Sequence, residues 1–275
     1  MANEKENLIQ EIEQNYTPRY SGRVYSKYSP AFITTNEDVF GTYQAINPKD
    51  KSVLTVCASG MHAIYAYMMG AKAVTSFDIS YCAEYIMKLH IAAIKSMPHW
   101  KYARFINQAF KRLSVPLNKN FQDIRANLDD DAKLFFDTMK DKKFIQNDLF
   151  NEPNVPIKSD FLKMRKTTPG AIKFLQTDIS DLYKKIDCKY DIIHLSNIFG
   201  YLHDDNEKAE IVYNLSEHMN SGGTMVVQYA YGNKPRAENA ARELQNALPW
   251  LSFETIELSG GIVPQYLAIM HKVRS

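Results

Sequence analysis

Hydrophobic residues along the chain follow two alternating patterns. Short apolar runs rich in β-branched residues and bounded by turn residues are typical of buried strands. Such runs predict strands at residues 53–57, 73–77, 172–176, 191–195, 224–229, 253–258 and 266–271. Between most of these runs, apolar residues recur every three or four positions, which predicts helices with one buried face. The predicted fold class is therefore α/β: a Rossmann-like, doubly wound, mostly parallel seven-stranded sheet with helices on both faces.

Two predicted helices show the apolar face clearly. In the helix after Asp78 the buried positions share one side: Cys82, Ile86, Leu89, Ala93 and Met97. The helix predicted over residues 206–219 is followed by Ser221-Gly222-Gly223, a sequence typical of a helix end.

A long interval separates the second predicted strand from the third. It holds two apolar stripes at helical spacing, one from Ile106 to Leu113 and one from Ile124 to Met139. They predict a helical insertion at about residues 98–165 within a main domain that covers residues 48–275. An insertion at this point lies at the carboxyl edge of the sheet, over the crevice where such folds bind ligands.

Residues 1–47 form a predicted N-terminal arm. After a short helix the arm is rich in tyrosine and proline and has no helical period, which is typical of an extended strap. Tyr20, Tyr25 and Tyr28 are candidates for a lid, because aromatic faces attract a sulfonium by cation–π interaction. Packing of the arm on the main domain is the alternative for these tyrosines.

Composition excludes several classes of protein. The hydrophobic share of 45% and the charged share of 23% are ordinary for a globular chain. A net charge of +2 gives no strong field to attract nucleic acid or an anionic membrane. No apolar run approaches the ~18 residues of a transmembrane helix, and the N-terminus lacks a signal-peptide pattern. The expected location is the cytoplasm. The spacing of the three cysteines is not that of a metal site, so no metal is expected. The oligomeric state stays open.

The segment Ser52–Ser80 indicates a nucleoside-binding site. A strand ends at the small-residue turn Ala58-Ser59-Gly60, a helix follows, and a second strand ends on Asp78. A small turn lets a ligand approach the helix N-terminus, and the acid can accept hydrogen bonds from both ribose hydroxyls. The turn lacks the three glycines of a dinucleotide site, so S-adenosylmethionine fits better. The alternative role for Asp78 is a cap on the next helix.

Residues near these positions extend the predicted cofactor site. His62 lies in the first turn of the helix, where contact with the ligand and a role in starting the helix are equally expected. Asp178 ends the next strand and can accept the adenine amino group, or it can cap a helix at Ser180. Ile79 and Ile179, which follow the two acids, complete this part of the set.

The strand at residues 191–195 carries the second group of candidates. Ser196 and Asn197 follow it, at the point where the reacting end of a ligand is expected, and the Asn197 amide suits an amino-acid group. Tyr201 and His203 are the candidate catalytic residues, His203 as a general base. A solvent-exposed loop is the favoured alternative for His203, and His194 is expected to be a buried structural histidine.

These residues resemble the class I S-adenosylmethionine-dependent transferases, and among them the betaine-lipid-synthase-type family. The resemblance covers roughly residues 50–230 and rests on four segments: 53–60, 77–80, 88–95 and 195–202. It implies a class I methyltransferase-like fold, S-adenosylmethionine as donor substrate, and transfer of its 3-amino-3-carboxypropyl group. The chain departs from the family's usual residues at Met61-His62 and at Gly200.

Three functions follow from this interpretation. The favoured one is aminocarboxypropyl transfer to a small-molecule or lipid acceptor that the sequence does not identify. The second is methyl transfer to a small molecule, since both reactions share the sulfonium leaving group and differ in the carbon that faces the nucleophile. The third is a non-catalytic nucleoside-binding module. No nucleic-acid partner is expected.

Overall fold

The computed structural model describes residues 2–17, 26–116, 118–146, 153–202, 204–229, 234–258 and 265–272. The chain forms two compact units whose segments alternate along the sequence. Unit 1 comprises residues 1–36, 57–64 and 78–176, and unit 2 comprises residues 37–56, 65–77 and 177–275.

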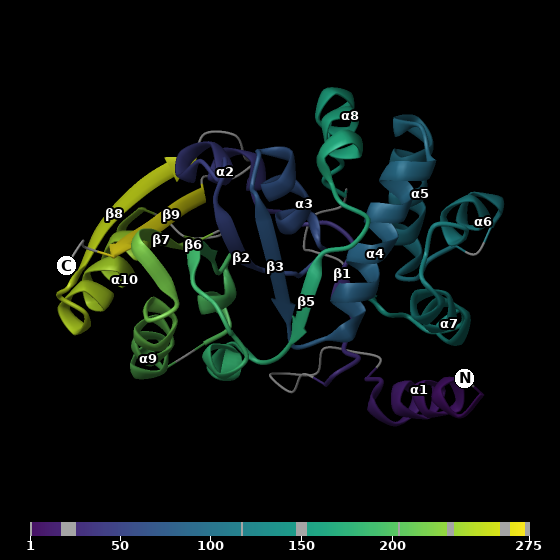
Figure 1. The fold of residues 1–275 in the computed structure, drawn as a ribbon, viewed down its shortest axis with the longest axis horizontal. Coiled ribbons are helices and arrows are strands. Elements are labelled where there is room, and N and C mark those ends of the chain that lie inside the picture. Colours follow the sequence, from purple (N-terminus) through teal and green to yellow (C-terminus); the bar gives the residue numbers. More distant parts are fainter. Residues whose placement is uncertain are drawn as a thin grey trace. The chain divides into compact units, whose positions relative to one another are not determined.

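The seven predicted strands are all present and form one sheet. Its strand order is β5-β3-β2-β6-β7-β9-β8 (Figure 1). The strands are β2 (Ser52–Val56), β3 (Ala73–Asp78), β5 (Lys173–Gln176), β6 (Tyr190–His194), β7 (Met219–Tyr229), β8 (Leu251–Leu258) and β9 (Gln265–Lys272). β2 pairs in parallel with β3 and β6, β6 pairs in parallel with β7, and β9 runs antiparallel between β7 and β8. The mostly parallel, doubly wound sheet is therefore confirmed.

The order of the strands places a topological switch point at β2 and β6. Successive strands add on one side of β2 up to β5, and the chain then returns to the other side with β6. Val53, Leu54 and Ile193 in these two strands have no exposed surface. Ligands of open α/β sheets bind beyond the carboxyl ends of strands at such a point.

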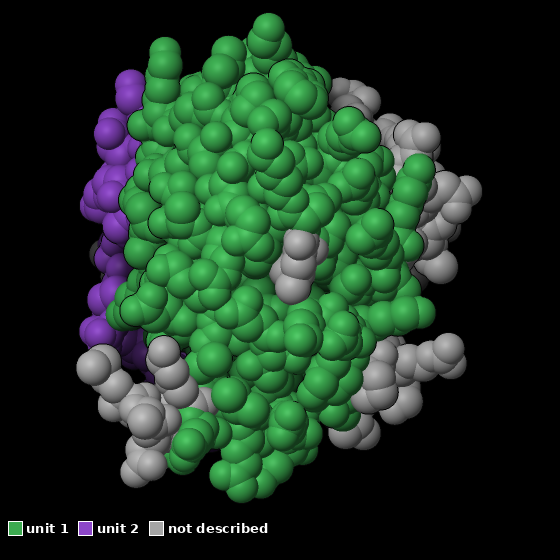
Figure 2. Space-filling view, turned by 90° about the vertical axis from the view of Figure 1, so that its right-hand side faces the viewer, with its two compact units in different colours: residues 1–36, 57–64, 78–176 green, residues 37–56, 65–77, 177–275 purple. Residues whose placement is uncertain are grey.

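Unit 1 is built around the long helix α4 (Tyr81–Ser96). The helices that pack against it are α5 (His99–Arg112), α6 (Lys119–Arg125), α7 (Asp130–Thr138) and α8 (Lys158–Thr167). Tyr85 of α4 stacks on Phe135 of α7 with ring centroids 4.0 Å apart. Figure 2 shows the surface of this unit in green. The helical insertion predicted from the two apolar stripes is present.

Two features of unit 1 differ from the sequence prediction. The stripe from Ile124 to Met139 belongs to two helices, because the Asp129 side chain accepts the Ala132 N–H at 2.8 Å and starts α7. A small parallel sheet pairs β1 (Ala31–Phe32) with β4 (Ile145–Gln146), and α1 (Ala2–Asn15) contacts α7.

The remaining helices lie wholly or partly in unit 2. They are α2 (Val39–Ile46), α3 (Met61–Met68), the 3₁₀ turns η1 (Ile179–Lys184) and η2 (Ile198–Gly200), α9 (Asp205–Ser216) and α10 (Lys234–Ala247). α3 begins in unit 1 and ends in unit 2. α10 packs against β8 and β9. In the described part of the chain, no helix is both long enough and apolar enough to span a membrane.

The predicted helix end at Ser221-Gly222-Gly223 is wrong. α9 ends at Ser216, and the glycine pair lies inside β7. The pairing of β6 with β7 shifts register there, between Tyr190 and Ile192. Gly222 has a φ of 73°, which glycine adopts without steric cost and which suits a β-bulge as well as a helix end.

Candidate functional site

The backbone of the turn after β2 adopts dihedral angles that are unfavourable for most residues. Ala58 and Gly60 both have positive φ, 48° and 80°, and the Gly60 N–H donates to the Cys57 carbonyl at 2.6 Å. A Cβ atom on Gly60 would lie 2.5 Å from Cβ of Met87 in α4. Glycine is therefore required at this position by the turn and by the close approach of α4.

Asp78 ties this turn to the start of α4. Its Oδ2 accepts the Ala58 N–H and its Oδ1 accepts the Ser80 N–H, each at 3.0 Å. Burial raises the pKa of Asp78 to about 6, although these N–H groups favour the charged form. Each carboxylate oxygen has a second lone pair, so Asp78 can accept ribose hydroxyls while it holds the turn. The cap of α4 is Ser80, whose Oγ accepts the Cys82 N–H at 3.1 Å, so Asp78 is not the cap itself.

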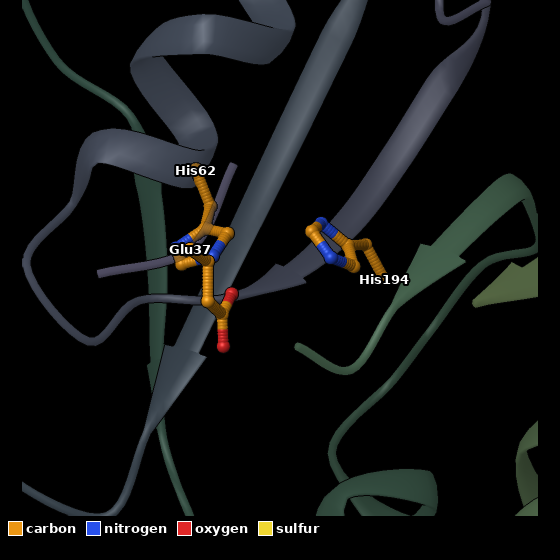
Figure 3. Close-up of side chains that lie close together, drawn as sticks. All are labelled: Glu37, His62 and His194. Atoms are coloured by element: carbon orange, nitrogen blue, oxygen red, sulfur yellow. The ribbon is translucent and has the colours of Figure 1, made fainter. Parts of the chain in front are cut away.

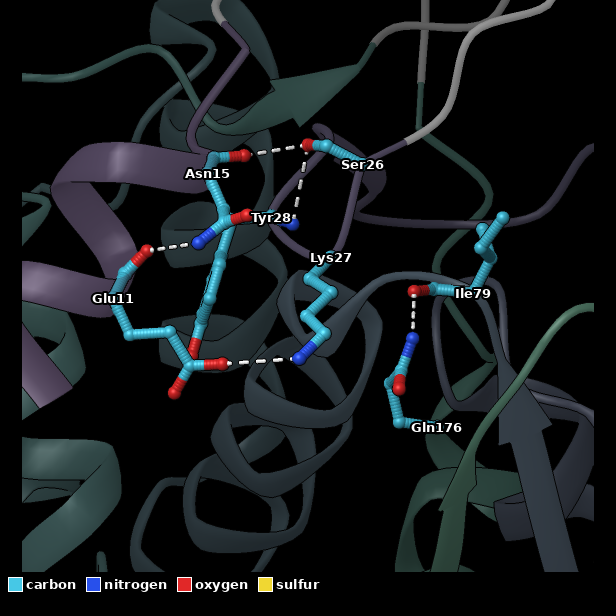
Figure 4. A network of polar contacts seen from close by, with 7 residues as sticks. All are labelled: Glu11, Asn15, Ser26, Lys27, Tyr28, Ile79 and Gln176. Atoms are coloured by element: carbon cyan, nitrogen blue, oxygen red, sulfur yellow. Dashed lines mark hydrogen bonds and ion pairs between the residues drawn. The ribbon is translucent and has the colours of Figure 1, made fainter.

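Three further residues of the predicted site in unit 1 lie within the turn or close to it or to Asp78 in the sequence: Ser59, His62 and Ile79. Ser59 and His62 are fully buried, and His62 lies in the first turn of α3. The Ile79 carbonyl accepts the side-chain N–H of Gln176, at the end of β5, at 2.9 Å (Figure 4). The loop after β3 is thereby fixed to the neighbouring strand end.

The N-terminal arm reaches the same loop. The Lys27 carbonyl accepts the Tyr81 N–H at 2.8 Å, and the Ser29 carbonyl accepts the Ser80 hydroxyl at 2.6 Å. Ser26 Oγ donates to the Asn15 carbonyl at 2.6 Å, at the end of α1 (Figure 4). The described ends of the arm on either side of residues 18–25 are therefore held together beside the start of α4.

The predicted lid tyrosines fall partly on described residues. Tyr28 is buried, and its ring centroid lies 5.5 Å from that of Tyr81. Burial raises the pKa of the Tyr28 hydroxyl. Tyr20 and Tyr25 lie outside the described residues. The lid role of the three tyrosines stays a prediction.

In unit 2, the chain turns sharply after β6. Ser196 has a φ of 54°. Its hydroxyl donates to Oε1 of Glu37 at 2.5 Å, and the Asn197 N–H donates to the same oxygen at 3.1 Å. Sequence reasoning missed Glu37, because an acid directly before the N-cap residue Asp38 looks like an ordinary polar helix start.

Glu37 belongs to a buried polar cluster at the carboxyl ends of β2 and β6, which we define as Glu37, Tyr43, Thr55, His194 and Ser196. A ring nitrogen of His194 lies within 4.8 Å of a Glu37 carboxylate oxygen. The Tyr43 ring meets that of His194 edge-on, with centroids 5.4 Å apart. Figure 3 shows the side chains of Glu37 and His194, together with His62. The prediction that His194 is buried is confirmed.

The other candidates of unit 2 have simpler surroundings. Asp178 is exposed and caps η1 by accepting the Ser180 N–H at 2.9 Å, so its predicted capping role is confirmed. Ile179 is buried and Tyr201 is exposed. His203 lies outside the described residues. The adenine contact of Asp178 and the catalytic roles of Tyr201 and His203 stay predictions.

Each unit thus contains one group of residues that is suited to binding a ligand. In unit 1, a carboxylate and a strained turn stand at the N-termini of α3 and α4, where backbone N–H groups and a hydroxyl-accepting acid suit a ribose. In unit 2, a buried carboxylate, an imidazole and an amide stand at the carboxyl ends of the two switch-point strands. Such groups suit a zwitterionic ligand group.

Comparison with known proteins gives similarity of overall structure only. The sequence matches no known family profile and no curated protein sequence. The N-methyltransferase NodS from Bradyrhizobium japonicum WM9, solved with S-adenosylhomocysteine, is 14% identical, with 81% of this chain and 78% of that chain covered and a TM-score of 0.41. Magnesium protoporphyrin IX methyltransferase from Synechocystis PCC 6803, solved with bound S-adenosylmethionine, is 12% identical, with 86% and 75% covered and a TM-score of 0.41. TrmN from Thermus thermophilus is 11% identical, with 86% and 48% covered and a TM-score of 0.45. These values are too low to assign a reaction or a substrate.

Proposed function

We propose that the protein is an S-adenosylmethionine-dependent transferase. The observation that carries the proposal is Asp78, which accepts backbone N–H groups from the first turn and from the start of α4 and keeps lone pairs for a ribose. The turn lacks a pyrophosphate-binding glycine pattern, which favours a nucleoside without phosphates. The proposed donor site comprises Ala58, Ser59, Gly60, His62, Asp78, Ile79, Asp178, Ile179, Ser196 and Asn197.

Within this class we favour transfer of the 3-amino-3-carboxypropyl group. The support is the resemblance of four sequence segments to betaine-lipid-synthase-type proteins and the presence of the helical insertion after β3. Methyl transfer to a small molecule is the second candidate, supported by the same fold and the same donor site. A non-catalytic nucleoside-binding module is the third. In each transfer reaction the enzyme holds the sulfonium carbon in line with the nucleophile of the acceptor.

Calorimetry tests the donor site directly. Asp78→Ala should weaken S-adenosylmethionine binding by about 1–3 kcal/mol, because ribose hydroxyls lose a charged acceptor. Asp181→Ala is the matched control, since Asp181 is an exposed acid that pairs with Lys184 in η1. Unchanged affinity in the Asp78 variant would remove this residue from the site. Absence of binding by the wild-type protein would contradict the proposal as a whole.

Product analysis distinguishes the three functions. The protein is incubated with S-adenosylmethionine and a panel of amines, alcohols and diacylglycerol vesicles as acceptors. Methylthioadenosine as product indicates aminocarboxypropyl transfer, and S-adenosylhomocysteine indicates methyl transfer. Binding without either product over the whole panel favours the non-catalytic module. The acceptor that supports turnover then identifies the substrate class, small molecule or lipid.

The N-terminal arm is the proposed lid of this site. Its support is the attachment of Lys27 and Ser29 to the first residues of α4, next in sequence to Asp78. Hydrogen exchange at residues 16–32 should slow when S-adenosylmethionine is added, because a ligand that contacts the arm lowers the population of its locally open states. If hydrogen exchange in this segment does not change on addition of the ligand, the lid hypothesis is wrong and the arm has a packing role only.

A further inference from the structure

Three large apolar side chains of unit 1 are exposed at its surface. Trp100 in the first turn of α5, Ile157 at the start of α8 and Leu162 within α8 are 63%, 65% and 44% exposed. In the described part of unit 1, no other large hydrophobic side chain is exposed. We call these three residues the apolar patch. Exposed apolar groups that gather in one place are typical of a surface that contacts a partner.

The packing of two helices brings the apolar patch together. α5 and α8 lie side by side within unit 1 (Figure 1). His99, the first residue of α5, donates its Nε2–H to the Pro156 carbonyl at 2.8 Å, and its ring centroid lies 5.3 Å from that of Phe161. Each residue of the apolar patch directly follows one of these three residues in the chain. The patch therefore surrounds the contact between the two helices.

The exposure of Ile157 has no explanation within the fold. Ile157 occupies the N-cap position of α8, and its side chain makes no capping hydrogen bond. Isoleucine is among the least favourable residues at this position, where a serine, threonine, aspartate or asparagine accepts a helix N–H. Side chains of this kind cap α2, α4, α6, α7 and α9. A residue that neither caps its helix nor packs in the core is suited to a contact outside the molecule.

The same two helices concentrate positive charge around the apolar patch. α5 carries four lysine and arginine residues and no acid, and α8 carries four and one acid. The exposed ones near the patch are Arg104, Lys158, Lys163 and Lys166. The ammonium group of Lys101 lies 5.8 Å from the centre of the Trp100 ring. The net charge of the whole chain, +2, does not reveal this strongly basic region.

We propose that this surface docks on an anionic phospholipid membrane, with the apolar patch inserted among the head groups and the basic side chains against the lipid phosphates. Interfacial segments combine tryptophan and aliphatic residues with lysine and arginine in this way, and anionic head groups attract basic residues. Nucleic acid also attracts basic residues, but Ile157 and Leu162 offer no ring on which a base can stack. A second copy of the chain would bring like charges together.

The two tryptophans of the chain provide a direct test. Trp250→Phe leaves Trp100 as the reporter, and Trp100→Phe leaves Trp250, an exposed residue of unit 2, as the matched control. Vesicles of phosphatidylcholine, with and without phosphatidylglycerol, are added to each variant at low and at high salt. The emission of Trp100 should shift to shorter wavelength with the anionic vesicles, and less at high salt, because salt screens the attraction. The emission of Trp250 should stay unchanged.

Ile157→Ser separates docking from stability. Serine can cap α8, so the urea midpoint should stay the same or rise. Cosedimentation with the anionic vesicles should show about five- to fiftyfold weaker binding, because a large apolar side chain no longer leaves water.

A pair of charge reversals tests the basic residues. Lys163→Glu should weaken binding to the anionic vesicles. Lys189→Glu changes an exposed lysine of unit 2 and alters the net charge equally, and it should bind like the wild-type protein.

The outcomes are independent of the proposed function, because the vesicle measurements contain no S-adenosylmethionine. Absence of vesicle binding at low salt overturns the inference. Equal binding to neutral vesicles, or binding that Ile157→Ser and Lys163→Glu leave unchanged, overturns it as well. Binding to an RNA homopolymer without binding to vesicles would assign the surface to nucleic acid. A dimer that Ile157→Ser dissociates, again without vesicle binding, would assign it to a second copy of the chain. Either result would overturn the inference.

Discussion

Burial and hydrogen bonding act in opposite directions on the carboxyl group of Asp78. Burial is the larger effect and raises its pKa to about 6. The charged form is the one with lone pairs for the two ribose hydroxyls of the proposed donor, so its population decides how well Asp78 can serve the proposed site. The residue therefore makes the proposed donor site sensitive to pH in a range where an exposed aspartate would stay charged.

Donor affinity should fall as the pH drops below about 6, because Asp78 then takes up a proton. Calorimetry with S-adenosylhomocysteine between pH 5 and pH 8 checks this, with Asp78→Asn as a control whose weak binding does not titrate. Without ligand, the contribution of Asp78 to the stability of the protein should depend on pH in the opposite direction. The folded pKa lies above the unfolded value, so the contribution of Asp78 to stability falls as the pH rises from about 4 to about 6, by about 2–3 kcal/mol. A flat affinity profile would contradict the prediction.

Gly60 should be the least replaceable residue of the first turn. Gly60→Ala places a Cβ atom 2.5 Å from Met87 Cβ at a φ of 80°, which should cost about 2–4 kcal/mol of unfolding free energy from strain and overpacking. Gly170→Ala is the matched control within unit 1, because a Cβ there meets nothing within 4 Å. Urea unfolding of the two variants measures the difference. Equal unfolding free energies of the two variants would contradict the prediction and show that the turn adjusts to the added methyl group.

Candidate site residues can be predicted from the sequence only where they lie together in a short segment with a recognisable pattern. Asp78 and Gly60 could be found because they lie within one short strand-turn-helix-strand segment. Glu37 could not, since its partners Ser196 and Asn197 are 159 and 160 positions away in the sequence and meet it only in the folded chain. The contact of Gly60 with Met87, which adds a packing requirement to the turn, is likewise a tertiary fact that no motif contains.

At the level of elements, a buried histidine joins the arm to the helices of unit 1. His90 of α4 donates its Nε2–H to the Ile33 carbonyl at 2.7 Å. Its other ring nitrogen, Nδ1, therefore accepts the hydroxyl of Tyr102 in α5, at 2.8 Å. Burial lowers the pKa of His90 to about 4, so the ring stays neutral at physiological pH. The arm, α4 and α5 are thus connected through one uncharged side chain.

Loss of this connection should destabilise unit 1. His90→Leu removes the hydrogen bonds that His90 makes with the Ile33 carbonyl and the Tyr102 hydroxyl and should cost about 2–4 kcal/mol, whereas Tyr102→Phe should cost about 1 kcal/mol. Urea titrations at several pH values measure both. Because the folded pKa of His90 lies below the unfolded value, the contribution of His90 to stability should fall as the pH drops from about 6.5 to about 4, opposite in sign to the contribution of Asp78. The stability difference between the wild-type protein and His90→Leu should therefore shrink over this range. A His90→Leu protein that keeps this part of the slope would contradict the assignment.

The sequence predicts helices and strands well where the apolar pattern is local. It predicts them poorly where a glycine or a capping residue determines where a helix begins or ends. The seven strands follow from apolar runs, and the mostly parallel sheet follows from their alternation with helices. The helix end at Ser221-Gly222-Gly223 was wrong because a glycine pair serves a β-bulge and a helix end through the same positive φ. The break between α6 and α7 was missed because the apolar stripe continues across it and only the Asp129 cap marks it.

On the scale of the whole molecule, the chain passes between the two units five times, after residues 36, 56, 64, 77 and 176. Neither unit is a continuous segment of the chain. We therefore expect the two units to unfold as one cooperative system.

The two tryptophans allow this to be measured. Trp100 lies in unit 1 and Trp250 in unit 2, so Trp250→Phe and Trp100→Phe each leave one reporter. Fluorescence-detected urea transitions of the two variants should coincide with each other and with the loss of circular dichroism. S-adenosylhomocysteine should shift both midpoints upward together, since a ligand that binds only the folded protein stabilises it by mass action. Separate midpoints would show that the units unfold independently.

The place of β2 in the sheet has a consequence for synthesis on the ribosome. β2 is nearly fully buried between β3 and β6, yet β2 ends at Val56 and β6 begins at Tyr190. At the usual speed of translation, β6 is made roughly 7–27 s after β2. Throughout that time one edge of an apolar strand stays unpaired in the nascent chain, which invites pairing with another chain. The growing polypeptide is therefore expected to depend on chaperones until its second half has been made.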